Sequence, residues 1–193
     1  MPHSLTVRNK SVNVKMKLEF HPVTKERWPD FESLFESKGS PHNCWCTAWR
    51  YVEKKGAKPG KNEKKTSIKT SISNNIPIGI MAYSNNEPIA WCSIAPRETY
   101  RSLGGEVSKK NVWSLVCFFI KRAFRNNGIS KLLLTEAIKY AKENGAEFIE
   151  AYPVEPDSPS YRFMGFIHTF EKANFKFIKK AGARRNVMLL ELN

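Results

Sequence analysis

The chain has 193 residues, 41% of them hydrophobic and 12% aromatic, which is typical of one folded domain and excludes a disordered chain. Its formal net charge of +14 raises the question of nucleic acid as a partner. No zinc-finger, RNP or helix-turn-helix pattern accompanies the charge, so a solvated basic surface is the preferred interpretation and nucleic acid is not expected to bind.

The location of the protein is predicted from what the sequence lacks. No apolar run reaches the roughly 18 residues that span a bilayer. The polar segment Met1–Lys10 has no apolar centre of a secretory signal. We therefore expect a cytoplasmic protein that does not bind a membrane and whose four cysteines are free thiols.

The N-terminal half is expected to contain one strand and two helices. Residues 1–12 are predicted to be a loose tail before a single domain over residues 13–193. Val14–Phe20 alternates apolar and charged residues, as a half-buried strand does. A helix is expected from Thr24, as its cap, to about Ser37, and another around Glu63–Ile72.

The C-terminal half alternates strands and helices. Gly79–Tyr83 and Pro88–Ile94 flank a turn-forming cluster and predict a hairpin, and the apolar run Val112–Ile120 predicts a central strand buried on both faces. The remaining predicted elements are a helix over Gly128–Asn144, a strand over Phe148–Pro153, a short helix over Ile167–Asn174, and a hairpin of Phe175–Lys179 with Asn186–Leu192. This order indicates an α+β or α/β domain with a mixed sheet.

The turn between the central strand and the best helix has the properties of a phosphate site. A helix N-terminus exposes unpaired N–H groups and a partial positive charge, and Gly128 lets the backbone adopt unusual dihedral angles there. Successive amides in such a turn form a concavity that binds anions. Lys121, Arg122 and Arg125 add positive charge. The sequence therefore predicts a phosphate cradle at this turn.

This segment resembles the GNAT superfamily of acyl-CoA N-acyltransferases, whose signature Arg/Gln-x-x-Gly-x-Gly/Ala follows a strand and opens a helix. The matching residues are Arg125, Gly128 and Ser130, the last a departure that keeps a small side chain and an N–H. The resemblance runs from about Gly79 to the C-terminus, whereas the first 75 residues match only as a strand followed by helices. It implies an α+β fold, three-layered like an α/β domain, with a mixed, mostly antiparallel sheet flanked by helices.

The resemblance also implies where acetyl-CoA binds. Residues Phe118, Phe119 and Ile120, at the end of the central strand, would pair with the pantetheine arm, and one of their amides would polarise the thioester carbonyl. Arg125 and the backbone amides of the turn would hold the pyrophosphate. Those amides belong to Asn126, Asn127, Gly128, Ile129 and Ser130.

The resemblance does not supply the acid, because many relatives have a tyrosine where this chain has Phe170. Phenylalanine cannot protonate the CoA thiolate. Glu150 and Tyr152 share one face of the strand beside the expected thioester, so we take them as candidate base and acid. The alternatives are a solvated or ion-paired strand residue for Glu150 and a core aromatic for Tyr152.

The aromatic segment from Cys44 to Tyr51 allows two interpretations. His42, Cys44 and Cys46 are too few for a zinc site without a second ligand pair, so no metal is expected. By similarity to other GNAT proteins, Trp45, Trp49 and Arg50 would line the acceptor pocket. An aromatic core beneath the first helix explains them equally well.

The sequence therefore predicts an N-acetyltransferase that moves an acetyl group from acetyl-CoA to a primary amine of an unidentified small molecule or protein, by direct attack. The alternative is a non-catalytic acyl-CoA-binding or sensing module, which Phe170 motivates. The sequence does not indicate an oligomeric state, and a homodimer is among the alternatives.

Overall fold

The structure is a computed structural model that describes residues 4–9, 14–41, 43–53 and 58–192. Its strands are β1 (Ser4–Asn9), β2 (Val14–Pro22), β3 (Ile80–Ser84), β4 (Glu87–Pro96), β5 (Val112–Ile120), β6 (Phe148–Ala151), β7 (Lys176–Ala181) and β8 (Arg185–Glu191). Its α-helices are α1 (Trp28–Glu36), α2 (Lys61–Ser73), α3 (Ile129–Glu143) and α4 (Ile167–Glu171). Short 3-10 turns are η1 (Arg97–Thr99), η2 (Arg122–Phe124) and η3 (Arg162–Met164).

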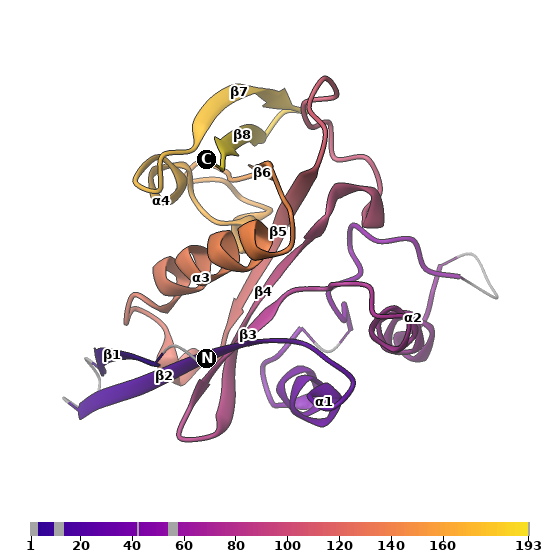
Figure 1. Cartoon of the computed structure of the whole chain (residues 1–193). Coiled ribbons are helices and arrows are strands. Elements are labelled where there is room, and N and C mark those ends of the chain that lie inside the picture. The colour runs from indigo at the N-terminus through magenta and orange to yellow at the C-terminus, as the bar shows by residue number, and fades with distance from the viewer. Residues whose placement is uncertain (1–3, 10–13, 42, 54–57, 193) are drawn as a thin grey trace.

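All of these strands form one sheet in the order β1-β2-β3-β4-β5-β6-β8-β7. Only β5 and β6 run parallel, and every other neighbouring pair is antiparallel. The crossover between the parallel strands contains α3, as a parallel connection requires. The predicted mixed, mostly antiparallel α+β fold is confirmed (Figure 1).

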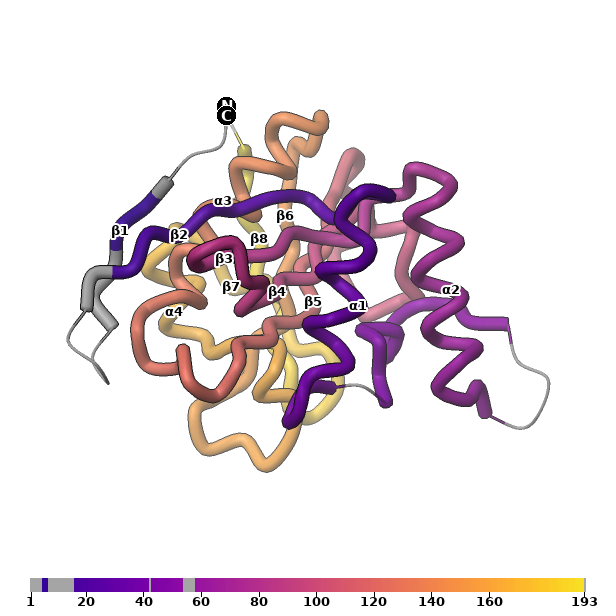
Figure 2. Tube along the Cα trace, turned by 90° about the horizontal axis from the view of Figure 1, so that it is seen from below, coloured from indigo at the N-terminus to yellow at the C-terminus, as the bar shows by residue number. Residues whose placement is uncertain are grey.

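Helices cover both faces of the sheet and give it two main apolar cores. The apolar stripe of α3 (Ile129, Leu133, Leu134, Ala137) packs on one face, which we call the α3 side. Phe31 and Phe35 of α1 and Ile68 of α2 pack on the opposite face, which we call the α1–α2 side. Figures 1 and 2 show α1 and α2 together on the face away from α3.

Most predicted elements are present, and two differ at the N-terminal end. Within the expected tail, Ser4–Asn9 forms strand β1, which pairs with β2. The first helix begins at Trp28 and not at Thr24, because a turn precedes it and Pro29 lies in its first turn, where a missing N–H costs nothing. No helix in the described part of the chain is long and apolar enough to cross a membrane.

Candidate functional site

The parallel strands β5 and β6 separate into a fork. Their last paired residues are Leu115 and Ala151, where β6 ends, while β5 continues to Ile120. The pairing of β4 with β5 shifts register just there, between Ser93 and Ile94, as at a β-bulge. The fork thus opens one edge of β5 in the middle of the sheet.

The bulge changes which β5 side chains face which core. Leu115, before the bulge, and Phe118, after it, both face the α3 side although they are three positions apart. Val116 and Cys117 are consecutive, yet both contact the cluster around Tyr100 and Tyr152 on the α1–α2 side. Strand alternation would have placed them on opposite faces. The bulge therefore places two neighbouring side chains on the α1–α2 face at the fork.

Beyond the bulge, β5 presents backbone groups to the fork. The Lys121 N–H donates to the Ile89 carbonyl at 2.9 Å. Because backbone groups alternate in an antiparallel pair, Phe119 also bonds toward β4, while Phe118 and Ile120 point their N–H and C=O groups toward the fork. The Ile120 carbonyl accepts a hydrogen bond from Arg125 Nε at 3.0 Å.

Of the three predicted pantetheine-binding residues, two are therefore placed to use their backbone. The exception is Phe119, because its groups face β4 and its side chain is buried in the core on the α1–α2 side. Sequence reasoning could not separate the three, since the direction of each group depends on the register with β4.

The predicted cradle follows β5 after the short 3-10 turn η2. Asn126 (φ +63°) and Gly128 (φ +76°) both lie in the left-handed region, and Gly128 is the N-cap of α3. Among the described residues, the N–H groups of Ile129 and Ser130 donate to no backbone carbonyl, and a Cβ at Gly128 would meet nothing within 4 Å. The turn thus offers amides and open space to an anion.

The side chains of the turn hold this shape. Buried Asn127 donates from Nδ2 to the carbonyls of Phe124 and Arg125, both at 3.2 Å. Arg125 is exposed and returns to the end of β5, so it closes the turn as well as adding charge. Lys121 is paired with Glu87 at 2.7 Å, and that contact neutralises part of the basic cluster.

A cavity of about 280 Å³ lies beside the cradle, between α3 and α4. Ser130 and Lys131 of α3 line one side, and His168 and Lys172 of the α4 region line the other. Two lysines beside a run of unpaired amides make this end of the fork suitable for a polyanionic ligand.

The candidate catalytic pair meets in a buried network. The Tyr152 hydroxyl donates to Glu150 Oε1, and the Ser114 hydroxyl donates to the same oxygen at 2.9 Å. The other oxygen, Oε2, accepts from the Glu106 N–H at 3.2 Å and lies 3.4 Å from Arg97 Nη1. Glu150 and Tyr152 are both fully buried.

This network gives the two residues different properties. Burial, and secondarily the charge of Glu150, raises the pKa of Tyr152, so its hydroxyl stays protonated. Tyr152 directly follows the last β6 residue paired with β5 and lies at the fork, while Glu150 lies behind it against the loop that carries Arg97 and Glu106. The sequence did not point to Ser114 or Arg97. Ser114 reaches Glu150 only through the register of β5 with β6, and Arg97 lies 53 positions before Glu150 in the chain.

The Phe170 side chain is not exposed at the fork. It is fully buried on the α3 side, with Phe118 and Phe175 rings 6.3 and 5.2 Å away between centroids. A Cβ at Gly165 would lie 2.8 Å from its ring, so the position is tightly packed. Phe170 therefore serves the core.

The aromatic segment divides between the two interpretations. Trp45 is fully buried and stacks with Phe35 and Trp28, so for this residue the aromatic core is confirmed. Trp49 is half-buried, with Arg185 over its ring at 4.6 Å, and Arg50 lines a cavity described below. His42 lies outside the described residues, and within them no cluster of three metal-ligating side chains occurs.

The cysteines are free, and Cys46 is buried at the centre of a hydrogen-bonded cluster. Trp91 Nε1 donates to its sulfur at 3.1 Å. A hydrogen bond with Cys117, helped by Trp91, Ser93 and the charge of Arg50, outweighs burial and lowers the pKa of Cys46 to about 7.

Comparisons with known proteins agree with this geometry. Residues 20–166 match the family model described as acetyltransferase (GNAT) family. Similar solved structures include the GNAT domain of S. lividans PAT (14% identity, TM-score 0.62, 99% of this chain and 97% of that one). Another is PaiA N-acetyltransferase from Thermoplasma acidophilum in complex with coenzyme A (20%, 0.53, 91% and 99%).

An uncharacterised protein from Bacillus halodurans is also similar, at 15% identity and a TM-score of 0.61, with 97% of this chain and 90% of that one covered. At these identities the likeness shows the fold. A search of curated proteins finds no match to this sequence.

Proposed function

Because this chain belongs to the GNAT family of acetyltransferases, we propose that it transfers an acetyl group from acetyl-CoA to a primary amine by direct attack. The observation that carries the proposal is the combination of a fork with an open β5 edge and a cradle of unpaired amides at the start of α3. We further propose that it acts in the cytoplasm on a small molecule or a protein.

The cradle suits the pyrophosphate of the CoA moiety. The N–H groups of Asn126, Gly128, Ile129 and Ser130 would donate to the phosphate oxygens, with the start of the α3 macrodipole behind them. Asn127 keeps the turn in shape, and its own amide belongs to the predicted set. Lys131 and Lys172, beside the adjoining cavity, would neutralise further phosphate charge.

The open edge of β5 suits the extended pantetheine arm, which carries amide groups and can pair with a strand. The Phe118 N–H and C=O and the Ile120 N–H would make those bonds. One of these two N–H groups would polarise the thioester carbonyl as an oxyanion hole, since both point into the fork before the ligand arrives.

Tyr152 and Glu150 would move the proton. The reaction releases one proton from the attacking amine, and the CoA sulfur must gain one. Tyr152 would accept the amine proton while passing its own to Glu150, along the hydrogen bond that joins them. Reversal of that step would deliver the proton to the sulfur and restore both groups, so the neutral amine can react without a tyrosine at position 170.

Two measurements test the proposal. One is calorimetric titration with acetyl-CoA at two salt concentrations, and the other is the release of free thiol in the presence of amines. We expect one site with micromolar affinity, and amine-dependent thiol release. Binding without thiol release from any amine would favour the non-catalytic module. No binding would remove the cradle from the proposal.

A further inference from the structure

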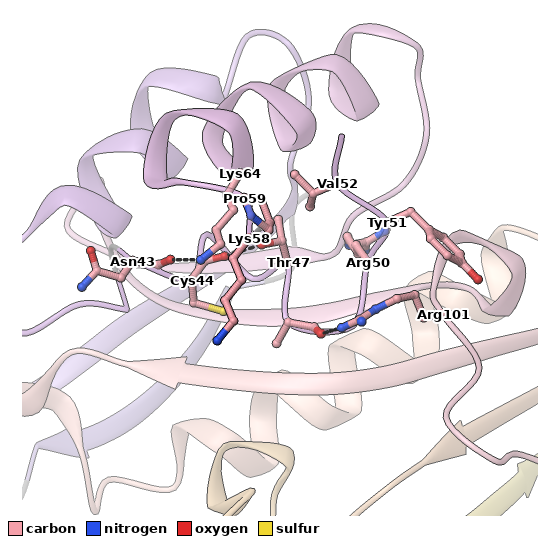
Figure 3. A pocket seen from close by; sticks show the side chains of 11 residues that line it. Asn43, Cys44, Thr47, Arg50, Tyr51, Val52, Lys58, Pro59, Lys64 and Arg101 are labelled. Atoms are coloured by element: carbon pink, nitrogen blue, oxygen red, sulfur yellow. Dashed lines mark hydrogen bonds between the residues drawn. The ribbon is translucent and has the colours of Figure 1, made fainter. Parts of the chain in front are cut away.

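A second, larger cavity lies on the α1–α2 side, away from the cradle, with a volume of about 590 Å³. Four cationic side chains line it: Arg50, Lys58, Lys64 and Arg101. No aspartate or glutamate is among the described residues around it. In Figure 3, Lys58 and Lys64 lie on one side of Thr47, and Arg50 and Arg101 on the other.

Arg50 is the least usual of the four, because its residue is only 6% exposed. Its guanidinium donates to Thr99 Oγ1, the Ile78 carbonyl and the Tyr100 hydroxyl, all of which are neutral acceptors. Its Nε is buried and has no hydrogen-bond partner among the described residues. No carboxylate pairs with this buried charge within the described chain, and the arrangement favours an anion nearby, as it favours the ionised form of Cys46.

The other three cations also lack acidic partners within the described chain. Lys64 donates to the Asn43 carbonyl at 2.8 Å and Arg101 donates to the Ala48 carbonyl, which positions both side chains and leaves their charges uncompensated. By contrast Lys65, the next residue along α2, contacts both Glu32 and Glu36. Acidic side chains therefore lie beside α2, but none lines the cavity among the described residues.

Two hydrogen bonds link Arg50, at this cavity, to Ser93 on β4 beside the fork. Arg50 donates to the Tyr100 hydroxyl at 2.9 Å, and that hydroxyl lies 3.0 Å from Ser93 Oγ. Ser93 is opposite Cys117 in the β4–β5 pairing, at the bulge where the fork opens. A hydrogen-bonded chain of buried side chains, Arg50, Tyr100 and Ser93, thus runs from the cavity to the bulge.

We propose that this cavity binds the anionic group of the acceptor, so that the preferred substrate is an amine bearing a carboxylate or a phosphate. This inference rests on the proposed acetyl transfer. The cations hold the anion at the cavity, and the amine at the other end of the same molecule reaches the thioester in the fork. Arg50 gains a carboxylate or phosphate partner, and a planar guanidinium can donate two parallel hydrogen bonds to either kind of anion.

Matched amines test the charge requirement. Thiol release is measured with ethanolamine against phosphoethanolamine, and with β-alaninamide against β-alanine, so that the two pairs separate phosphate from carboxylate. We expect kcat/KM to be at least about tenfold higher for the anionic member of at least one pair, as for one charge-assisted hydrogen bond. Equal use within both pairs would overturn the proposal.

Lys58→Gln locates the effect. Lys58 is exposed and its side chain makes no hydrogen bond or ion pair that is resolved among the described residues, so the variant is expected to fold. It should lower kcat/KM for the anionic amine by about tenfold and leave the neutral amine unchanged. Lys110→Gln, an exposed lysine outside the cavity, is the control. Equal losses for both amines in Lys58→Gln would contradict the assignment.

Inorganic phosphate separates the anion site from the transfer reaction. At constant ionic strength, phosphate should raise the melting temperature of the wild-type protein more than chloride does, and this difference should shrink in Lys58→Gln. If no amine is acetylated but this pattern holds, the anion site stands and the transfer reaction fails. If phosphate and chloride act alike on the wild type, the anion site itself is overturned.

Discussion

The two faces of the fork are built in different ways. On the α3 side, the residues proposed to bind CoA come mainly from one continuous stretch, from Phe118 to Ser130. On the α1–α2 side, the cavity combines residues near position 50, residues of the 58–64 region and Arg101. A contiguous site can be recognised as a motif, whereas an assembled site depends on the packing of distant segments. This difference explains why the sequence suggested a cofactor and did not suggest an acceptor.

Gly128→Asp should produce the largest effect and acts only on the contiguous side. The aspartate would place a negative charge where the amides converge, so acetyl-CoA affinity should fall by about a thousandfold in titration calorimetry. The fold should survive, because a side chain at this position meets open space and aspartate is among the few residues that adopt the left-handed region. Gly145→Asp, with a similar positive φ and open space just after α3, is the matched control and should bind normally. Unchanged affinity in a folded Gly128→Asp protein would rule out the cradle.

Trp45→Ala should damage the assembled side. The indole is fully buried against Phe35 and Trp28, so the free energy of unfolding should fall by about 3–4 kcal/mol in denaturant titration. Tyr51→Ala, at a side chain 72% exposed, should change it by less than about 0.5 kcal/mol. A small loss for Trp45→Ala would show that the aromatic cluster does not support this face.

Tyr152→Phe tests the group between the two faces. It should lower kcat by about a hundredfold in thiol-release assays while acetyl-CoA affinity is retained, because the relay to Glu150 loses its middle atom. Glu150→Gln should slow transfer similarly, and the double variant should be no slower than the slower single one. Tyr140→Phe, on the α3 side, is the control. Additive losses would mean that the two residues act separately.

Cys46→Ser should produce the smallest effect, visible as a pH dependence. In the folded protein the thiol loses its proton near pH 7, against a usual value of 9.0, so between these values the unfolded state binds more protons. Stability from this group therefore rises with pH through that window and is lost as pH falls through 7. Between pH 7 and pH 9, the difference in unfolding free energy between wild type and Cys46→Ser should grow by on the order of 2 kcal/mol. A constant difference would contradict the lowered pKa.

Sequence and structure contributed differently along the chain. Periodicity predicted β5 and α3 almost to the residue, because one is a continuous apolar run and the other a clear apolar stripe ended by Gly145. The prediction of a loose tail over residues 1–12 was wrong for Ser4–Asn9, which forms β1 and pairs with β2. An edge strand contacts only one neighbour, so its own sequence shows only a weak alternation of apolar and polar residues.

The sequence by itself determined the fold class and the glycine turn at the start of α3, because both depend on local rules: the period of apolar residues, and a glycine at the start of a helix after a buried strand. Only the tertiary structure decided the rest. It excluded the Phe119 backbone from the fork through the register with β4, buried Glu150 behind Tyr152, and gathered Arg50, Lys58 and Arg101 around one cavity. Such contacts join residues tens of positions apart, and no local pattern specifies them.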